Sequence, residues 1–297
     1  MKKHILISDV IAADYAYDMA NPEIVIGKSE GKYGEPVENR IIRVPNSGKL
    51  PGYDLITDQG GWIAVFAPSK NLANLPGPLF IESSARFNGR PACFFDSMNA
   101  EAYLEHLDAR FNMNALLSIT GNPRDQSTFF KTFYGYRQPF DVAVLHRAHG
   151  EPFPNTQSAI DTFEPEGGPS IVRLPGESNK SYWGMLTGFE FHGHKYGRTP
   201  IEMSEDMTIL FVARFYEDKS FLELNWRDSS GVLQTSRTHT VMANNGNFTN
   251  FFLGATGSGY TSAVALKMGT WTEAEIDQLR SWAAEYLPPV GKLPQEP

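Results

Sequence analysis

Short segments rich in β-branched and aromatic residues, separated by Gly, Pro, Asn and Asp, recur along most of this chain. Runs of four to eight such residues between turn residues are typical of antiparallel sandwiches and barrels. We therefore expect an all-β fold built as an antiparallel β-sandwich. The expected strands are Arg40–Val44, Trp62–Phe66, Pro91–Asp96, Ala115–Thr120, Thr128–Tyr134, Asp141–His146, Met207–Phe215, Phe221–Trp226, Asn250–Gly254 and Ser262–Met268.

The segment Phe221–Arg227 shows the clearest strand pattern. Leu222, Leu224 and Trp226 alternate with polar residues, so they share one face of a strand. Residues 228–231 then form a turn into a second strand. This pair of segments predicts a β-hairpin with one buried face.

One helical segment is predicted, near the C-terminus. Thr272 and Glu275 have the spacing of a capping box. Apolar residues then recur at helical intervals, and Pro288 and Pro289 end the pattern. We expect a short helix whose apolar stripe covers the sandwich. The residues of that stripe are Ile276, Leu279, Trp282, Ala283 and Leu287.

Three regions lie outside this pattern. Residues 1–61 are rich in Gly and Pro and contain two apolar segments, Ile5–Ile11 and Ile41–Val44. We read Ile5–Ile11 as a short strand or docking segment. The whole region forms either long loops laid on the main domain or an extended arm that docks on a partner. Residues 62–287 form the sandwich, with a polar, loop-rich insert near 150–184, and residues 288–297 form a flexible tail.

Composition excludes several classes of function. The 297 residues carry a formal net charge of −8, which disfavours binding to nucleic acid. A single cysteine, Cys93, excludes an internal disulfide framework. No apolar run is long enough to span a membrane. Lys2 and Lys3 precede an apolar run that ends at Ser8, which is too short for a signal peptide. We expect no nucleic-acid partner, no membrane insertion and no standard secretion.

The usual catalytic and metal-binding patterns are missing. His146 with His149, and His192 with His194, have metal-like spacing, but no acidic residue completes either pair in a motif. Glu223 stands alone on its predicted strand, whereas a glycosidase needs two carboxylates at a working distance. We therefore predict that the chain is not an enzyme and has no catalytic residue, no metal and no cofactor.

One group of aromatic and histidine residues lies outside the predicted core. Sugars are recognised by aromatic faces with adjacent polar groups, and this group is the densest candidate for such a site. The alternative is that these residues pack under a loop, and the sequence alone does not separate exposed from buried aromatics. The candidate carbohydrate-binding residues are Tyr182, Trp183, His192, His194 and Tyr196.

Two stretches resemble a known family. Residues from Phe87 to Asp96 are similar to the opening strand of concanavalin A-like (laminin-G-like) lectin and glucanase sandwiches. The C-terminal third resembles the closing half of the same fold. It carries a strand at Thr208–Arg214, a hairpin, the strand Ser262–Met268 and a helix that opens at Trp271. The resemblance implies a jelly-roll sandwich with a short C-terminal helix and an extended N-terminal region.

Domains of this kind without a signal peptide resemble virion proteins of tailed bacteriophages. The resemblance implies a non-enzymatic structural protein, such as a capsid decoration or a tail or fibre component. It would be made in the host cytoplasm and lie on the virion surface. Its partners would be further copies of itself, other virion proteins and a host-surface glycan. The alternative is a carbohydrate-active enzyme, a glycoside hydrolase or lyase, on the same fold.

Overall fold

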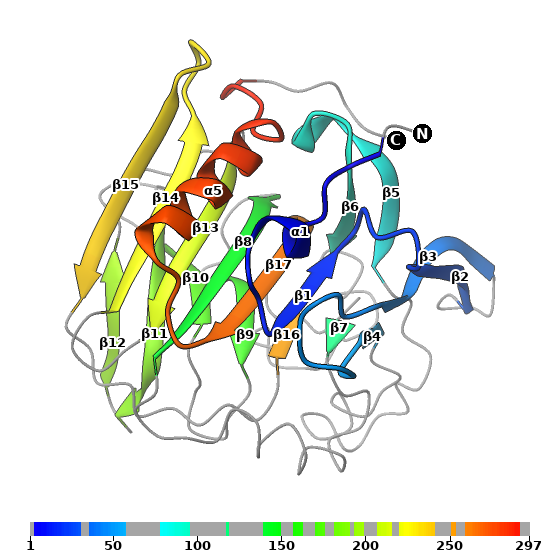
Figure 1. Cartoon of the computed structure of the whole chain (residues 1–297), viewed down its shortest axis with the longest axis horizontal. Helices are drawn as coiled ribbons and strands as arrows, with labels where there is room; N and C mark the ends of the chain where they lie inside the picture. Colours follow the sequence, from blue (N-terminus) through cyan, green and yellow to red (C-terminus); the bar gives the residue numbers. More distant parts are fainter. Residues whose placement is uncertain are drawn as a thin grey trace.

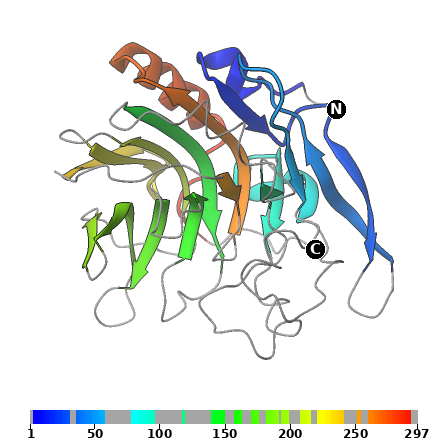
Figure 2. The ribbon, with the colours of Figure 1, turned by 90° about the horizontal axis from the view of Figure 1, so that it is seen from below.

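Two antiparallel β-sheets face each other, and two helices cover the outer face of one of them (Figures 1 and 2). The computed structural model describes residues 3–30, 36–57, 78–95, 117–118, 139–149, 157–162, 170–175, 181–190, 193–198, 207–215, 220–240, 251–253 and 259–291. The predicted all-β sandwich with a C-terminal helix is confirmed. The predicted strands at 62–66 and 128–134 lie outside the described residues.

The central sheet is built around β8 (Phe140–Ala148). Its strands run in the order β15, β14, β13, β8 and β17, and every neighbouring pair is antiparallel. Val144 lies opposite Phe211 on one side and Val264 on the other. The bounds of the other four strands are β13 (Thr208–Phe215), β14 (Ser220–Arg227), β15 (Leu233–Thr240) and β17 (Gly259–Met268).

Beyond β17 the sheet continues into the N-terminal part of the chain. β6 (Arg90–Phe95) pairs with the start of β17, and β1 (Tyr15–Asp18) pairs with its second half. β6 pairs in turn with β5, which contacts β3, and β3 also pairs with β2 and β4. The bounds of these strands are β2 (Val25–Glu30), β3 (Pro36–Val44), β4 (Leu55–Thr57) and β5 (Leu79–Ser84).

The second sheet lies behind the central one and contains β9, β10, β11 and β12, paired in that order. Short strands connect β9 to β4 of the first sheet through β16 (Phe251–Leu253) and β7 (Leu117–Ser118). The bounds of the four strands are β9 (Gln157–Thr162), β10 (Ser170–Pro175), β11 (Ser181–Glu190) and β12 (Gly193–Arg198).

This second sheet corrects the interpretation of residues 150–184 as a loop-rich insert that is too polar for a core. That region supplies β9, β10 and the start of β11. Ile171 and Trp183 are fully or almost fully buried there. The apolar residues stand singly or in pairs between Gly, Pro and polar residues, so no continuous strand pattern is visible in the sequence.

Both faces of β8 are buried, and its side chains alternate between two cores. Val142 and Val144 contribute to the inner core, which lies between the sheets and includes Trp183. Ala143 and Leu145 contribute to the helix-side core. Burial on both faces explains why this strand reads as a continuous apolar run in the sequence.

Helix α5 (Glu273–Ala284) confirms the predicted C-terminal helix. The Glu275 backbone N–H donates to Thr272 Oγ1 at 3.2 Å, and the Thr272 backbone N–H donates to Glu275 Oε2 at 2.7 Å. These are the two bonds of a capping box. Ile276, Leu279 and Trp282 are buried in the helix-side core, so the helix packs across the outer face of the central sheet (Figure 1).

The N-terminal segment corrects a second expectation. Ile7–Val10 form α1, a single helical turn, so the strand alternative is wrong, whereas the segment does dock on the sandwich. Ile7 and Ile11 lie four residues apart and both enter the helix-side core beside α5. β1 then adds Tyr15 and Tyr17 to the inner core. Residues 3–30 and 36–57 therefore lie on the main domain, as the first of the two alternatives for residues 1–61 expects. They include strands as well as loops.

The C-terminal tail is also partly attached. The Val290 backbone N–H donates to the Arg227 carbonyl at 3.2 Å, and Pro289 forms an isolated bridge with Arg227. Residues 288–291 therefore lie against the end of β14, whereas residues 292–297 lie outside the described part. Within the described ranges, no helix has the length and apolar character needed to cross a membrane.

Candidate functional site

The aromatic residues predicted to bind sugar fall on two paired strands of the second sheet. Tyr182 and Trp183 lie on β11, and His194 and Tyr196 lie on β12. In the backbone ladder, Tyr196 stands opposite Leu186 and His194 opposite Phe189. His192 lies outside the described residues. The fold therefore brings four of the five predicted positions onto neighbouring strands.

Trp183 is a core residue, and this corrects its assignment to a sugar-binding surface. Its side chain is 1% exposed. The indole ring meets His146 edge-on at 5.6 Å between centroids and Phe211 at 4.6 Å. A sugar cannot stack on a ring that is covered in this way. Tyr182, the preceding residue on β11, is half-buried and keeps access to solvent.

His146 is buried next to Trp183 in the inner core. Its Nδ1 lies 3.0 Å from Thr261 Oγ1 on β17. Burial lowers the pKa of His146 to about 3, and the nearby charge of Arg173 acts in the same direction. The imidazole is therefore neutral at physiological pH, and it serves packing and hydrogen bonding inside the sandwich.

The spacing of His146 and His149 does not produce a metal site. His149 follows β8 and is exposed, whereas His146 is buried in the inner core. The described residues contain no cluster of three or more His, Cys, Asp or Glu that could hold a metal ion.

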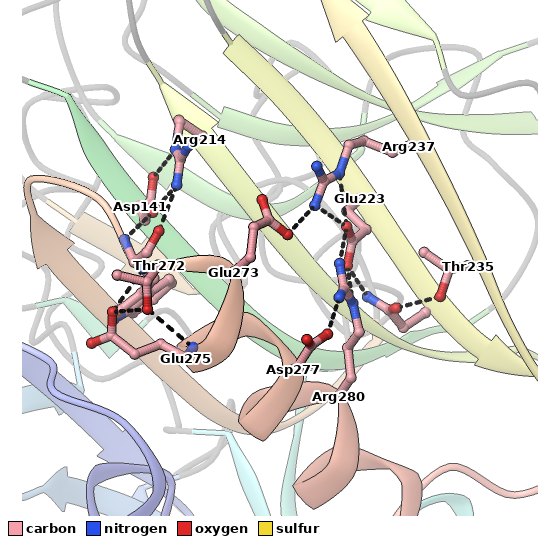
Figure 3. Close-up of polar contacts among 12 residues, drawn as sticks. Asp141, Arg214, Glu223, Thr235, Arg237, Thr272, Glu273, Glu275, Asp277 and Arg280 are labelled. Carbon is pink, nitrogen blue, oxygen red and sulfur yellow. Dashed lines mark hydrogen bonds and ion pairs between the residues drawn. The ribbon is translucent and has the colours of Figure 1, made fainter.

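Glu223 forms the centre of a charged cluster between β14, β15 and α5 (Figure 3). Its carboxylate is fully buried and lies 2.6 Å from Arg280 Nη2 and 2.6 Å from Arg237 Nη2. The Asn225 side chain donates a third contact at 2.9 Å. Burial raises the pKa of Glu223, but these hydrogen bonds outweigh it, so its pKa lies below the ordinary value. The carboxylate therefore stays ionised and fixes the helix to the sheet.

Two further buried carboxylates are also paired with arginine. Asp141 accepts two hydrogen bonds from Arg214, at 2.9 and 3.0 Å, and Asp18 accepts one from Arg90 at 2.5 Å. Burial raises the pKa of both carboxyls, although the paired arginines oppose the shift. The buried carboxylates of the described residues are thus held in ion pairs, and each contributes to structure.

A second aromatic group, which the sequence interpretation missed, lies where β6 and β17 meet the end of β8. Phe94 and Tyr260 are opposite each other in the ladder and stack at 4.4 Å between ring centroids. His149 meets both rings edge-on, at 5.3 and 5.8 Å. The Arg86 guanidinium lies 4.2 Å from the centre of the Tyr260 ring. We call these four residues the aromatic–arginine cluster.

The aromatic–arginine cluster reaches the surface while its base is fixed. Tyr260 is buried, Phe94 and Arg86 are half-buried, and His149 is exposed. Thr208 of β13 donates a hydrogen bond of 2.7 Å to the Arg86 carbonyl and accepts one of 3.2 Å from Arg147. In the sequence, Phe94 belongs to an apolar run and Tyr260 follows a glycine-rich stretch, so neither stands out from core aromatics.

The fold of this chain is similar to that of solved structures that share a β-sandwich. No protein-family model matches the sequence, and no curated protein matches it either. A crystal structure of an arabinofuranosidase complexed with arabinofuranosyl-α-1,2-xylobiose is similar at 11% identity and a TM-score of 0.57. The alignment covers 99% of this chain and 67% of that one.

A glycoside hydrolase family 54 α-L-arabinofuranosidase soaked with a cyclic sulfate inhibitor gives a TM-score of 0.58 at 10% identity. That alignment covers 97% of this chain and 66% of the other. The chain therefore spans about two thirds of the length of these enzymes. At this identity, the likeness establishes the shared sandwich fold.

Proposed function

We propose that this protein is a non-enzymatic glycan-binding sandwich protein of a bacteriophage virion surface, and that its aromatic–arginine cluster contributes to glycan binding. The carrying observation is the stack of Arg86, Tyr260 and Phe94 with His149 exposed beside it. Sugar sites combine an aromatic surface with a few polar groups. Phe94 and His149 supply ring surface at the solvent boundary, and Arg86 supplies hydrogen-bond donors for sugar hydroxyls.

The second sheet offers the other candidate surface. Tyr182, His194 and Tyr196 lie on adjacent strands, and Tyr182 is accessible. The two candidate surfaces are separated by the inner core, so substitutions in one leave the other intact.

An array of bacterial surface polysaccharides tests glycan binding and its location. We expect the parent protein to bind at least one polysaccharide and the double variant Phe94→Ala/His149→Ala to lose that binding. Val232→Ala, on the exposed β14–β15 turn, is the matched control. If Tyr182→Ala loses binding and the double variant does not, the glycan site lies on the second sheet. Absence of binding to the whole array contradicts the proposed glycan function.

The virion role rests on the sequence resemblance given above and needs a separate test. Mass spectrometry of purified virions should detect the chain as a stoichiometric component. Its absence from the particles, with presence only in infected-cell extract, contradicts the virion assignment.

A carbohydrate-active enzyme is the second candidate, because the likeness to arabinofuranosidases extends over nearly the whole chain. The ionic pairing of Asp18, Asp141 and Glu223 argues against these carboxylates as catalysts. Incubation with 4-nitrophenyl α-L-arabinofuranoside distinguishes the two candidates. Our proposal predicts no release of 4-nitrophenol above that of a heat-denatured sample, and sustained turnover by the parent protein contradicts it.

A further inference from the structure

A partly exposed tryptophan, Trp226, stands at the open end of the inner core. It is the last residue of β14 on the face that carries Leu222 and Leu224, and its side chain packs against the inner core. The other tryptophans of the described residues, Trp183, Trp271 and Trp282, are buried, whereas part of Trp226 remains accessible to solvent. The turn between β14 and β15 extends past the neighbouring strands at this end of the sheet (Figure 1).

Polar groups with unused hydrogen-bonding capacity lie beside this ring. Gln234 of β15 is directly opposite Trp226, and Ser236 lies two residues further along the same face of that strand. Cross-strand neighbours that are opposite or diagonal come within reach of an aromatic side chain. Within the described part of the chain, the Trp226 indole N–H, the Gln234 side-chain oxygen and the Ser236 hydroxyl form no hydrogen bond. One donor, one acceptor and one hydroxyl are therefore available next to an aromatic surface.

The hairpin holds these groups in a fixed arrangement. The Gln234 amide donates to Asp228 Oδ2 at 2.7 Å, which leaves the amide oxygen as the available acceptor. Asp228 Oδ1 in turn accepts the Val232 backbone N–H at 3.0 Å. The Arg227 guanidinium donates to the Ala284 carbonyl at 2.8 Å, so the hairpin is also attached to the end of α5. A ligand that binds here pays little to order the protein groups.

We propose that this end of the hairpin binds one uncharged hexopyranose ring, which packs on the exposed part of Trp226 while its hydroxyls hydrogen-bond to Gln234 and Ser236. An aromatic surface with a few fixed polar groups is the general design of a sugar site. The Arg227 guanidinium already donates to two backbone carbonyls, and the Asp228 carboxylate repels an anion. The arrangement therefore favours an uncharged sugar over an acidic one.

This site is separate from the aromatic–arginine cluster. Trp226 packs on the inner core, whereas Phe94 and Tyr260 of the cluster belong to the helix-side core. The inference therefore does not rest on the proposed function. A surface for one sugar ring gives a dissociation constant of about 1–10 mM, which is too weak to retain a glycan on a washed array.

Nuclear magnetic resonance of the tryptophan indole N–H groups tests the site directly. The sequence has five tryptophans, and the peak that disappears in Trp226→Phe identifies Trp226. The probes are the methyl glycosides of glucose, galactose and mannose, titrated into the full chain to about 100 mM, well above the expected dissociation constant. We expect at least one of them to shift the Trp226 peak in a saturable way. The matching uronic acid glycoside should bind at least about threefold more weakly.

Variants of neighbouring residues locate the contact. Gln234→Ala removes the acceptor and should raise the dissociation constant at least about fivefold. Thr235→Ala is the matched control, because Thr235 is adjacent but lies on the opposite face, where its hydroxyl donates to Asn225 at 2.8 Å. It should keep the parent affinity, and so should Phe94→Ala/His149→Ala, whatever that variant does on the polysaccharide array.

Three results would overturn the proposal. One is a Trp226 peak that none of the three neutral glycosides shifts. Another is an acidic glycoside that binds as tightly as the neutral one. The third is a Gln234→Ala protein that melts like the parent and binds the sugar equally well.

Discussion

Arg90 of β6 and Asp18 of β1 form an ion pair 2.5 Å long, and neither side chain is exposed to solvent. The same guanidinium donates to the carbonyl of Ile5 at 3.1 Å. Its planar group lies 4.9 Å from the centre of the Trp282 ring and 4.4 Å from that of Tyr286. One arginine thus connects the first residues of the chain, two strands of the sheet and the C-terminal helical region.

This arrangement explains why the N-terminal residues belong to the sandwich. Asp18 also accepts the backbone N–H of Ile7 at 2.8 Å, so α1 is fixed to the same carboxylate. Detaching the segment would leave Asp18 and Arg90 as buried charges with fewer partners, which is strongly unfavourable. An arm exchanged between subunits would have to rebuild these contacts.

Replacing Glu223 with Gln should destabilise the protein. The change leaves Arg237 and Arg280 close together without the carboxylate that neutralises them, and we expect a loss of roughly 3–5 kcal/mol. Urea unfolding at pH 7 measures it. Glu273→Gln is the control, since Glu273 is 63% exposed at the rim of the same cluster and should change stability by less than about 0.5 kcal/mol. Equal stability of Glu223→Gln and the parent contradicts the structural role of this cluster.

His146 should make stability depend on acidic pH. Its folded-state pKa of about 3 lies below the unfolded value of 6.5. Between these values only the unfolded state takes up the proton, so stability falls as pH decreases, by up to about 1.4 kcal/mol per pH unit. Urea unfolding between pH 7 and pH 4 measures this dependence. The free energy of unfolding of His146→Gln should fall less over this range than that of the parent protein. If the stability of His146→Gln falls with pH as steeply as that of the parent protein, His146 is not the source of the pH dependence.

Leu279→Asp should destabilise the whole domain by roughly 3–5 kcal/mol, because the Leu279 side chain of α5 is fully buried in the helix-side core. Gln278→Asp introduces the same residue at the adjacent exposed position and serves as the control. Thermal melting followed by circular dichroism compares them. If both variants melt together with the parent, α5 does not pack on the helix-side core.

Gly48→Ala should cost about 1–3 kcal/mol. A Cβ at Gly48 would lie 2.3 Å from the Asp14 carbonyl oxygen and 2.6 Å from Tyr15 Cα, and both are backbone atoms. Gly52→Ala is the comparison. Its φ is +80° but nothing lies within 4 Å, so only the backbone cost of about 1 kcal/mol applies. A smaller loss at Gly48 than at Gly52 would mean that the loop moves away from β1.

Local patterns predicted the elements whose signals lie close together in the sequence. The capping box of Thr272 and Glu275 spans three residues, and the alternation of Leu222 and Leu224 is visible within one strand. The strands that form the second sheet were not predicted, because Ile171 and Trp183 become core residues only when the central sheet covers them. Likewise the sequence predicts a short strand or docking segment where α1 forms, since a single turn carries too few residues to show a helical period.

The candidate sites are formed by residues that lie far apart in the sequence and meet only in the folded protein. Glu223 looks like a lone carboxylate because Arg237 and Arg280 are 14 and 57 residues away along the chain. The aromatic–arginine cluster joins Arg86 to Tyr260, and no spacing rule connects such positions. Trp183 was assigned to a surface because sequence alone gives an aromatic residue no sign of burial.

The position of β17 between β8 on one side and β1 and β6 on the other has a consequence for synthesis. Among the described strands, β17 is the last in chain order, yet it fills the middle of the central sheet. Until residue 268 has emerged, the edge of β8 and the facing edges of β1 and β6 have no partner strand, and the inner core lacks the side chains of β17. Folding must therefore be completed after most of the polypeptide has been made, and a ribosome that stops before β17 releases an aggregation-prone fragment.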